Sequence, residues 1–222
     1  MSDRLWRRCV AEGLGTFTLV FAGCGAIVVD AERGGSLGTT GIAAAFGLAV
    51  MATVYAIGHV SGAHINPAVT AAFAATRHFP GREAVAYVPA QLLGAVAAVL
   101  VLRLVWEGQP AELGATVPSV AAGPAFVYEV VLTAVLMFVI MAVATDTRAV
   151  GSAAALAVGG TVALDALVGG DVTGASMNPA RSFGPALVAS EWADFWLYVA
   201  GPLTGALAGA LLYTLVRGPR AG

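Results

Sequence analysis

The chain contains no lysine, only two cysteines and few charged residues of either sign. Charged side chains make up 11% of its 222 residues and hydrophobic side chains 59%, whereas soluble globular domains carry about 25% charged residues. The net charge of −2 gives no indication of a nucleic-acid partner, and none is expected. This composition excludes an ordinary soluble domain and predicts a protein embedded in a lipid bilayer.

Cysteine and histidine are too scarce to build a disulfide framework or a metal centre. Cys9 and Cys24 lie near the two ends of the first apolar segment, and a helix of that length holds them too far apart for a disulfide. The scattered histidines and cysteines supply no metal-ligand cluster, and no cofactor is expected. An intramembrane enzyme would need a nucleophile beside a base. Apart from His59 and His64, no base lies at a depth similar to that of the serines in the apolar segments, so we expect no enzyme.

Three arginines precede the first apolar run, a pattern that also occurs in secretory signal peptides. Cys24 follows Ala-Gly, which faintly resembles a lipoprotein cleavage site. However, Glu12 interrupts the apolar region and has a counterpart in the second half of the chain. We therefore expect a first membrane-spanning helix here.

Six apolar segments with almost no charge are long enough to cross a bilayer, which takes about 20 helical residues. Their approximate ranges are 9–29, 39–58, 84–102, 129–145, 149–167 and 195–216. Two further apolar stretches are interrupted, one at 59–65 and one that Gly169, Gly170 and Asp171 lead into. We predict an all-α membrane protein with six transmembrane helices and two re-entrant half-helices.

The chain divides into two similar halves within a single domain, residues 1–222. A linker rich in glycine and proline, 107–124, separates halves of about 9–106 and 125–216. The pattern Glu12-x-x-x-Thr16 in the first half matches Glu129-x-x-x-Thr133 in the second. Because each half has three spans, the halves form an inverted repeat and both termini lie on one side.

The arginines are distributed unevenly between the two sides of the membrane. Eight of the eleven lie on the side that holds the chain ends, and the positive-inside rule makes that side cytoplasmic. We expect a multi-pass protein of the plasma (inner) membrane with both termini in the cytoplasm. The eight are Arg4, Arg7, Arg8, Arg77, Arg82, Arg148, Arg217 and Arg220.

Two matching stretches 112 residues apart carry the triplet Asn-Pro-Ala. Asparagine is a preferred helix N-cap and proline is favoured at the first helical position, so each triplet predicts a helix that starts inside the membrane. Interrupted segments at corresponding positions of two halves indicate a site at the bilayer midplane. The triplets are Asn66, Pro67 and Ala68, and Asn178, Pro179 and Ala180.

With this pair of triplets the chain resembles the aquaporin family from about Glu12 to about Leu215. The runs VATDTRAVG (143–151) and GASMNPARS (174–182) most resemble its nodulin-like branch. The resemblance implies a passive, homotetrameric channel for water and small neutral solutes, such as glycerol and arsenious or boric acid, that excludes protons and ions. The alternatives are a water-selective channel and a secondary transporter with broken helices. A transporter would need a coupling group at the midplane, where this chain offers amides and an arginine.

The resemblance places the narrowest point of the channel at Phe46, Ala166, Ala175 and Arg181. Water-selective members have a histidine and a small polar residue where this chain has Ala166 and Ala175. Phe46 stands where glycerol channels have tryptophan. We therefore expect a constriction that is wider and less polar than in a water-selective channel.

Arg181 and Asp165 are charged residues inside apolar segments. An intramembrane arginine costs about 2.5–3.5 kcal/mol on insertion scales, so it faces water or a partner. The family role for Arg181 is to donate to solute oxygens and repel cations, and the alternative is a salt bridge with Asp165 or Asp171. Asp165 itself either lines the vestibule on the far side and pairs with Arg181, or reaches the interface.

The two half-helices point their N-termini, each worth about +0.5 of a charge, at one pore. This predicts a barrier to protons and cations, with Asn66 and Asn178 donating to passing solutes; the alternative is that both only cap their helices. Glu12 and Glu129 either relay protons or, as the symmetry favours, accept hydrogen bonds from the adjacent re-entrant loops. For His64 in the cytoplasmic vestibule, a packed, neutral side chain is favoured over a pH gate.

Overall fold

The computed structural model describes residues 3–146, 148–149 and 153–218, and over these residues the chain is helical. Two residues named above lie outside this description. They are Thr147, which is part of the expected turn between the fourth and fifth spans, and Arg220, near the end of the chain. The helices are α1 (Asp3–Glu32), α2 (Gly38–Ser61), α3 (Pro67–Ala75), α4 (Gly81–Val105), η1 (Pro110–Gly114), α5 (Ala122–Thr145), α6 (Ala154–Thr173), α7 (Pro179–Ala189) and α8 (Leu197–Arg217).

Six of these helices are long and apolar enough to cross a membrane, namely α1, α2, α4, α5, α6 and α8. The other two α-helices, α3 and α7, have only 9 and 11 residues. At 1.5 Å per residue they reach about 14 and 17 Å, roughly half of the ~30 Å hydrocarbon core. The predicted fold of six spans and two half-helices is confirmed.

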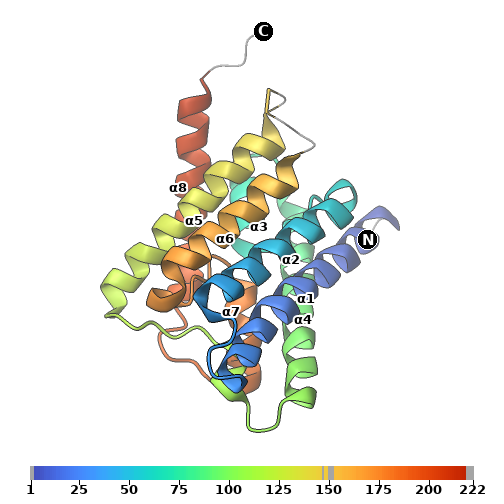
Figure 1. Cartoon of the computed structure of the whole chain (residues 1–222). Helices are drawn as coiled ribbons and strands as arrows, with labels where there is room; N and C mark the ends of the chain where they lie inside the picture. The colour runs from blue at the N-terminus through green and yellow to red at the C-terminus, as the bar shows by residue number, and fades with distance from the viewer. Residues whose placement is uncertain (1–2, 147, 150–152, 219–222) are drawn as a thin grey trace.

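The helices pack as an inverted repeat. In the first half α1 packs against α2 and α4, and in the second half α5 packs in the same way against α6 and α8. Each half-helix packs against the last span of the other half, α3 against α8 and α7 against α4. The start of α1 and the end of α8 lie on one face of the bundle, called here the proximal face, and the loop 33–37 and the linker lie on the distal face (Figure 1).

Close helix contacts depend on glycine at matching positions of the two halves. A Cβ added at Gly94 of α4 would overlap the carbonyl oxygen of Gly13 in α1. A Cβ at Gly205 of α8 would likewise overlap the carbonyl oxygen of Val130 in α5. Small residues let the backbones of membrane helices approach each other, so each half is closed by a backbone-to-backbone contact.

Two predicted boundaries were wrong. Gly169, Gly170 and Asp171 belong to the last turns of α6, which continues to Thr173, and not to the loop. The linker ends earlier than expected, because α5 begins at Ala122. The linker is also not a plain surface connection, since η1 folds inward and buries Leu113 and Gly114.

Candidate functional site

Each half-helix starts with the cap that its triplet predicts. Asn66 and Asn178 have extended backbones, and each is followed by proline at the first helical position. The Oδ1 of Asn66 accepts a hydrogen bond from the backbone N–H of Ala68 at 2.8 Å. The Oδ1 of Asn178 accepts from Ala180 at 3.0 Å and Arg181 at 3.4 Å. Both asparagine oxygens are therefore used for capping.

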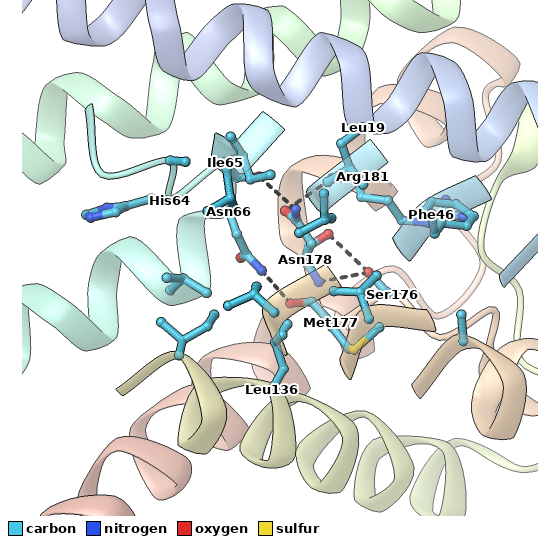
Figure 2. Close-up of a pocket in the computed structure, with 18 of the residues that line it drawn as sticks. Leu19, Phe46, His64, Ile65, Asn66, Leu136, Ser176, Met177, Asn178 and Arg181 are labelled. Carbon is cyan, nitrogen blue, oxygen red and sulfur yellow. Dashed lines mark hydrogen bonds between the residues drawn. The ribbon is translucent and has the colours of Figure 1, made fainter. Parts of the chain in front are cut away.

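The amide nitrogens of the same asparagines cross between the two halves. The Nδ2 of Asn66 donates to the carbonyl of Met177, and the Nδ2 of Asn178 donates to the carbonyl of Ile65, both at 2.8 Å (Figure 2). This reciprocal pair joins the N-termini of α3 and α7. Because each NH₂ group carries two protons, one proton on each asparagine remains for another acceptor.

Both re-entrant loops have an unusual and matching backbone. Positive φ angles are rare for residues other than glycine, and a β-branched residue such as Ile65 is a true outlier there. Each such residue costs about 1–3 kcal/mol and persists only where its surroundings hold it. The matching positions are Gly62, Ala63 and Ile65 in the first loop and Gly174, Ala175 and Met177 in the second.

The first loop is held by the carboxylate of Glu12, which is 0% exposed. Its Oε1 accepts from the hydroxyl of Ser61 at 2.7 Å and the backbone N–H of His64 at 2.9 Å. Its Oε2 accepts from the backbone N–H of Ile65 at 2.6 Å and the side chain of Gln91 at 2.8 Å. Four donors thus converge on one buried carboxylate, two of them from the strained backbone.

The second loop is held in the same manner by Glu129, also 0% exposed. The Oε1 of Glu129 accepts from the hydroxyl of Thr173 at 2.7 Å and the N–H of Ser176 at 2.9 Å. Its Oε2 accepts from the N–H of Met177 at 2.9 Å. These are the contacts that the loop-acceptor role of the two glutamates requires.

Three cavities lie in sequence along the axis of the bundle. The proximal cavity, of about 520 Å³, opens among Arg8, His59, His64 and His78. The central cavity is narrow, about 50 Å³, and is lined by His64 and by both capping asparagines. With about 10–15 Å³ needed for each water centre, it holds only a few waters in file. The distal cavity, of about 240 Å³, continues to the other face.

The four residues expected at the constriction line both the central and the distal cavity, and so lie where the two meet. They are Phe46 of α2, Ala166 of α6, Ala175 of the second loop and Arg181 of α7. Figure 2 shows Phe46 and Arg181 together at one end of the central cavity and His64 at the other, with the asparagines between them.

Arg181 is 2% exposed and is fixed without a carboxylate partner. Its Nη1 donates to the carbonyl of Gly114 at 2.7 Å, and its guanidinium carbon lies 5.0 Å from the centre of the Phe46 ring. The Nε and Nη2 have no protein acceptor among the described residues. The expected alternative of a salt bridge with Asp165 or Asp171 was wrong, because the linker carbonyl takes that place.

Asp165 does not occupy either of its expected positions. It is 4% exposed inside α6, does not line the three cavities, and its Oδ2 has no partner among the described residues. The acid that does line the distal cavity is Asp171, which accepts from the hydroxyl of Thr39 at 3.1 and 3.2 Å. Asp165 therefore neither lines the vestibule nor pairs with Arg181.

His64 is packed among aromatic rings. The rings of Phe73, Phe79 and Tyr87 lie 4.9, 4.7 and 5.3 Å from its own, centre to centre. Its Nδ1 lies 3.1 Å from the hydroxyl of Thr70. This environment is that of a packed side chain, although one edge of His64 lines both the proximal and the central cavity.

Two groups near the second loop were not anticipated from the sequence. Gly114 reaches Arg181 only because the linker folds inward, and the sequence holds no signal for that contact. A chain of hydroxyls also braces the start of α7, with Thr116 donating to Ser182 at 2.8 Å and Ser176 lying 2.6 Å from Ser182. Thr116 again comes from the linker.

Comparison with known proteins agrees with this geometry. The family model for major intrinsic proteins matches residues 1–213. This chain belongs to that family. Aquaporin NIP1-1 of Zea mays is 51% identical over 211 residues, which cover 95% of this chain and 75% of the relative. Nodulin-26 of Glycine max is 49% identical, with 95% and 78% covered. The expected resemblance to the nodulin-like branch is confirmed.

The fold also agrees with a solved structure of the family. The aquaglyceroporin from Plasmodium falciparum superposes with a TM-score of 0.84, covering 94% of this chain and 95% of that one, at 27% identity. Members of the family are channels and not enzymes. This chain is accordingly a passive membrane channel.

Proposed function

We propose that this channel conducts water, glycerol and uncharged metalloid acids such as arsenious or boric acid. The observation that carries the proposal is the pair of small apolar side chains, Ala166 and Ala175, that faces Phe46 and Arg181 between two cavities. Two methyl groups leave space where larger or polar side chains would close the constriction. The likeness to an aquaglyceroporin supports the wider solute range.

Arg181 selects for neutral solutes in this proposal. Its Nε and Nη2 are buried and have no acceptor among the described residues, so in this proposal they donate to a solute oxygen, while the fixed charge repels cations. Because Gly114 and Phe46 hold the guanidinium in place, its donors are already oriented when a solute arrives. Phe46 and the two alanines offer the carbon skeleton of a polyol an apolar surface.

The Asn66–Asn178 pair excludes protons in the same proposal. The second proton of each amide donates to the oxygen of a water or a hydroxyl at the centre of the pore. A water held by both donors cannot relay a proton along the file. The positive ends of α3 and α7 add the electrostatic barrier that is established for aquaporin-type pores. In this scheme Glu12 and Glu129 hold the loops and carry no protons, and His64 stays neutral.

We further propose that the protein works as a homotetramer in the plasma (inner) membrane, with one pore in each subunit. Large apolar side chains such as Leu48, Leu93 and Leu104 are exposed on the bundle and suit lipid or a neighbouring subunit. The arginines of the proximal face support a cytoplasmic location for both termini. Each subunit is then one channel domain built from two inverted halves, the second of which begins with α5 at Ala122.

Stopped-flow light scattering on proteoliposomes tests the solute range, with gradients of water, glycerol and arsenite run in parallel against empty vesicles. Fast volume changes with all three solutes are expected. Water flow alone would support a water-selective channel instead. Flow that depends on a cation gradient would favour a secondary transporter, and the absence of any flow above empty vesicles would contradict an open channel.

A further inference from the structure

An open groove of about 390 Å³ runs between α1 and α4, which pack side by side (Figure 1). It shares no lining residue with the three axial cavities. Its lining is apolar, and two of its residues, Leu14 of α1 and Leu93 of α4, are 62% and 70% exposed. The groove therefore opens on the outer surface of the bundle, where a membrane protein meets lipid or a neighbouring protein.

The shape of the groove follows from the close contact of the two helices. Gly13 and Gly94 meet backbone to backbone, because a Cβ on Gly94 would overlap the carbonyl oxygen of Gly13. On α1 the groove extends from Cys9 to Phe17. Eight residues of helix correspond to about 12 Å, most of one leaflet's share of the ~30 Å hydrocarbon core. A single extended hydrocarbon chain matches both this length and this lining.

The proximal mouth of the groove carries two exposed arginines. The Arg8–Glu83 ion pair joins α1 to α4 near their proximal ends. Arg7 and Arg82 are the sequence neighbours of that pair and are both exposed, so each helix places one arginine at the mouth. Trp6, which is 45% exposed, has its ring centre 5.5 Å from the guanidinium carbon of Arg7. Tryptophan and arginine near a helix end are typical of the boundary between lipid tails and headgroups.

Two positive charges at the mouth favour an anionic occupant. Neither Arg7 nor Arg82 forms a salt bridge with the described side chains. The described carboxylates of the proximal face, Glu83 and Asp146, are already paired with arginines. A second copy of the chain therefore offers no free carboxylate among these two. A phosphate attached to a hydrocarbon tail satisfies both the charge at the mouth and the apolar lining.

We infer that the groove between α1 and α4 binds an anionic phospholipid, with its phosphate between Arg7 and Arg82 and one acyl chain along the groove. Basic sites at the ends of membrane helices bind anionic headgroups. The headgroup bridges the two helices and the acyl chain covers the contact of Gly13 with Gly94, so the lipid holds α1 against α4. This site lies on the outer surface and does not depend on which solutes the channel conducts.

Quenching of Trp6 fluorescence by dibrominated lipids tests the site, because this ring lies at the mouth of the groove. The channel is reconstituted with dibrominated phosphatidylglycerol or dibrominated phosphatidylcholine, and the same measurement on Trp6→Phe is subtracted to remove the other three tryptophans. We expect phosphatidylglycerol to bind beside Trp6 about 25-fold more tightly than phosphatidylcholine, or about fivefold for each arginine.

The headgroup contacts are tested by single substitutions at the mouth. Arg7→Gln and Arg82→Gln should each lower the preference for phosphatidylglycerol about fivefold. The matched control is Arg77→Gln, which removes an exposed arginine of the proximal face that follows α3 and belongs to neither α1 nor α4. This control should change the preference less than about twofold.

The acyl-chain contact is tested by filling the inner end of the groove. Ala97→Phe places a ring among the lining residues of α4 and should weaken the binding of both lipids beside Trp6 about fourfold, the effect of roughly one buried CH₂ group. Its control is Ala56→Phe, at an exposed alanine of α2 outside the groove. That control should leave the binding of both lipids unchanged.

The possible results separate the lipid site from other causes. Equal quenching of Trp6 by the two lipids would overturn the site, and so would the same loss of preference in Arg77→Gln, because that would indicate a general effect of surface charge. Protection of Trp6 from both lipids would show that a second copy covers the groove. Both arginines are exposed, so their variants decide the question even if Ala97→Phe does not fold. No step measures solute flow, so a failed permeability assay would refute the proposed function and leave the lipid site standing.

Discussion

Residues 61–66 of the first re-entrant loop and residues 173–178 of the second are held alike, each by a buried glutamate and each ending in an asparagine cap. Three residues after the asparagine the halves diverge, with Val69 in α3 and Arg181 in α7. The shared contacts build the scaffold twice. Among the described residues where the central and distal cavities meet, the charge of Arg181 therefore comes from the second half. In the proposed function this arginine selects the solute.

The two loops also differ in the number of hydrogen-bond donors that their glutamate accepts from. Glu12 accepts from four donors, one of them Gln91, whereas Glu129 accepts from three. The position that matches Gln91 in α8 is Pro202, which has no amide to donate. The second loop is braced instead by the hydroxyls of Thr116 and Ser182. The two loops therefore share their positive-φ positions and differ in the side chains that support them.

The largest expected effect comes from removal of either glutamate. Glu129→Ala leaves three buried donors unsatisfied, at about 1–3 kcal/mol each, against a total stability of about 5–15 kcal/mol. The folded yield after solubilisation, measured by size-exclusion chromatography, should fall severalfold, and Glu12→Ala should fall at least as far because four donors are affected. A normal yield of Glu129→Ala with a new proton leak would contradict the structural role of Glu129.

Arg181→Val tests the divergence directly, because it makes the start of α7 resemble the start of α3. Without the fixed charge, cations and protons should leak through the constriction, and each ~1.4 kcal/mol removed from the barrier gives a tenfold higher leak. A pH-sensitive dye trapped in proteoliposomes measures the effect. Val69→Ala, a change at the matching position in the first half, serves as the control. A proton-tight Arg181→Val channel would show that the helix dipoles suffice.

Ala166→His sharpens the role of side-chain size at the constriction. An imidazole at this position fills the space beside Phe46 and adds a polar group. Glycerol permeability should fall about tenfold, a barrier increase of ~1.4 kcal/mol, while water flow is retained. Ala166→Val, which adds bulk without polarity, separates the two causes. Equal glycerol flow in all three channels would mean that α6 does not limit the solute.

The smallest expected effect concerns Asp146, which follows α5 on the proximal face. Hydrogen bonds from Arg148 hold the pKa of the Asp146 carboxyl well below its usual range, and Tyr213 also donates to it. The stabilisation is complete above the unfolded pKa of about 3.9 and is lost as the pH falls through the lower folded value. Thermal unfolding should show the parent losing stability below pH ~4, and Asp146→Asn should lack this loss. If Asp146→Asn still loses thermal stability at low pH, another carboxyl group is responsible for the loss.

Local patterns sufficed for much of the architecture. Six apolar runs predicted six spans, because only a helix of about 20 residues satisfies its own backbone across a bilayer. The Asn-Pro-Ala triplets predicted both helix starts, because N-cap and first-turn preferences act over a few residues. The end of α6 was missed because it depends on tertiary packing and not on a local preference. Gly169 weakens a helix locally by about 1 kcal/mol, which suggested that the helix ends there. In the structure a Cβ at this position would lie 2.5 Å from the side chain of Leu132 in α5, so the close packing of α6 against α5 requires glycine.

The sequence by itself determined the spans, the inverted repeat and the paired half-helices, and the family resemblance predicted the four residues that line both the central and the distal cavity. Only the tertiary structure decided what those residues touch. Asn66 bonds to Met177 across 111 residues, and Arg181 to Gly114 across 67, while Asp165 is left buried without a bond to its Oδ2. Such contacts depend on how helices distant in the chain are placed against each other, and no local preference of the backbone encodes that placement.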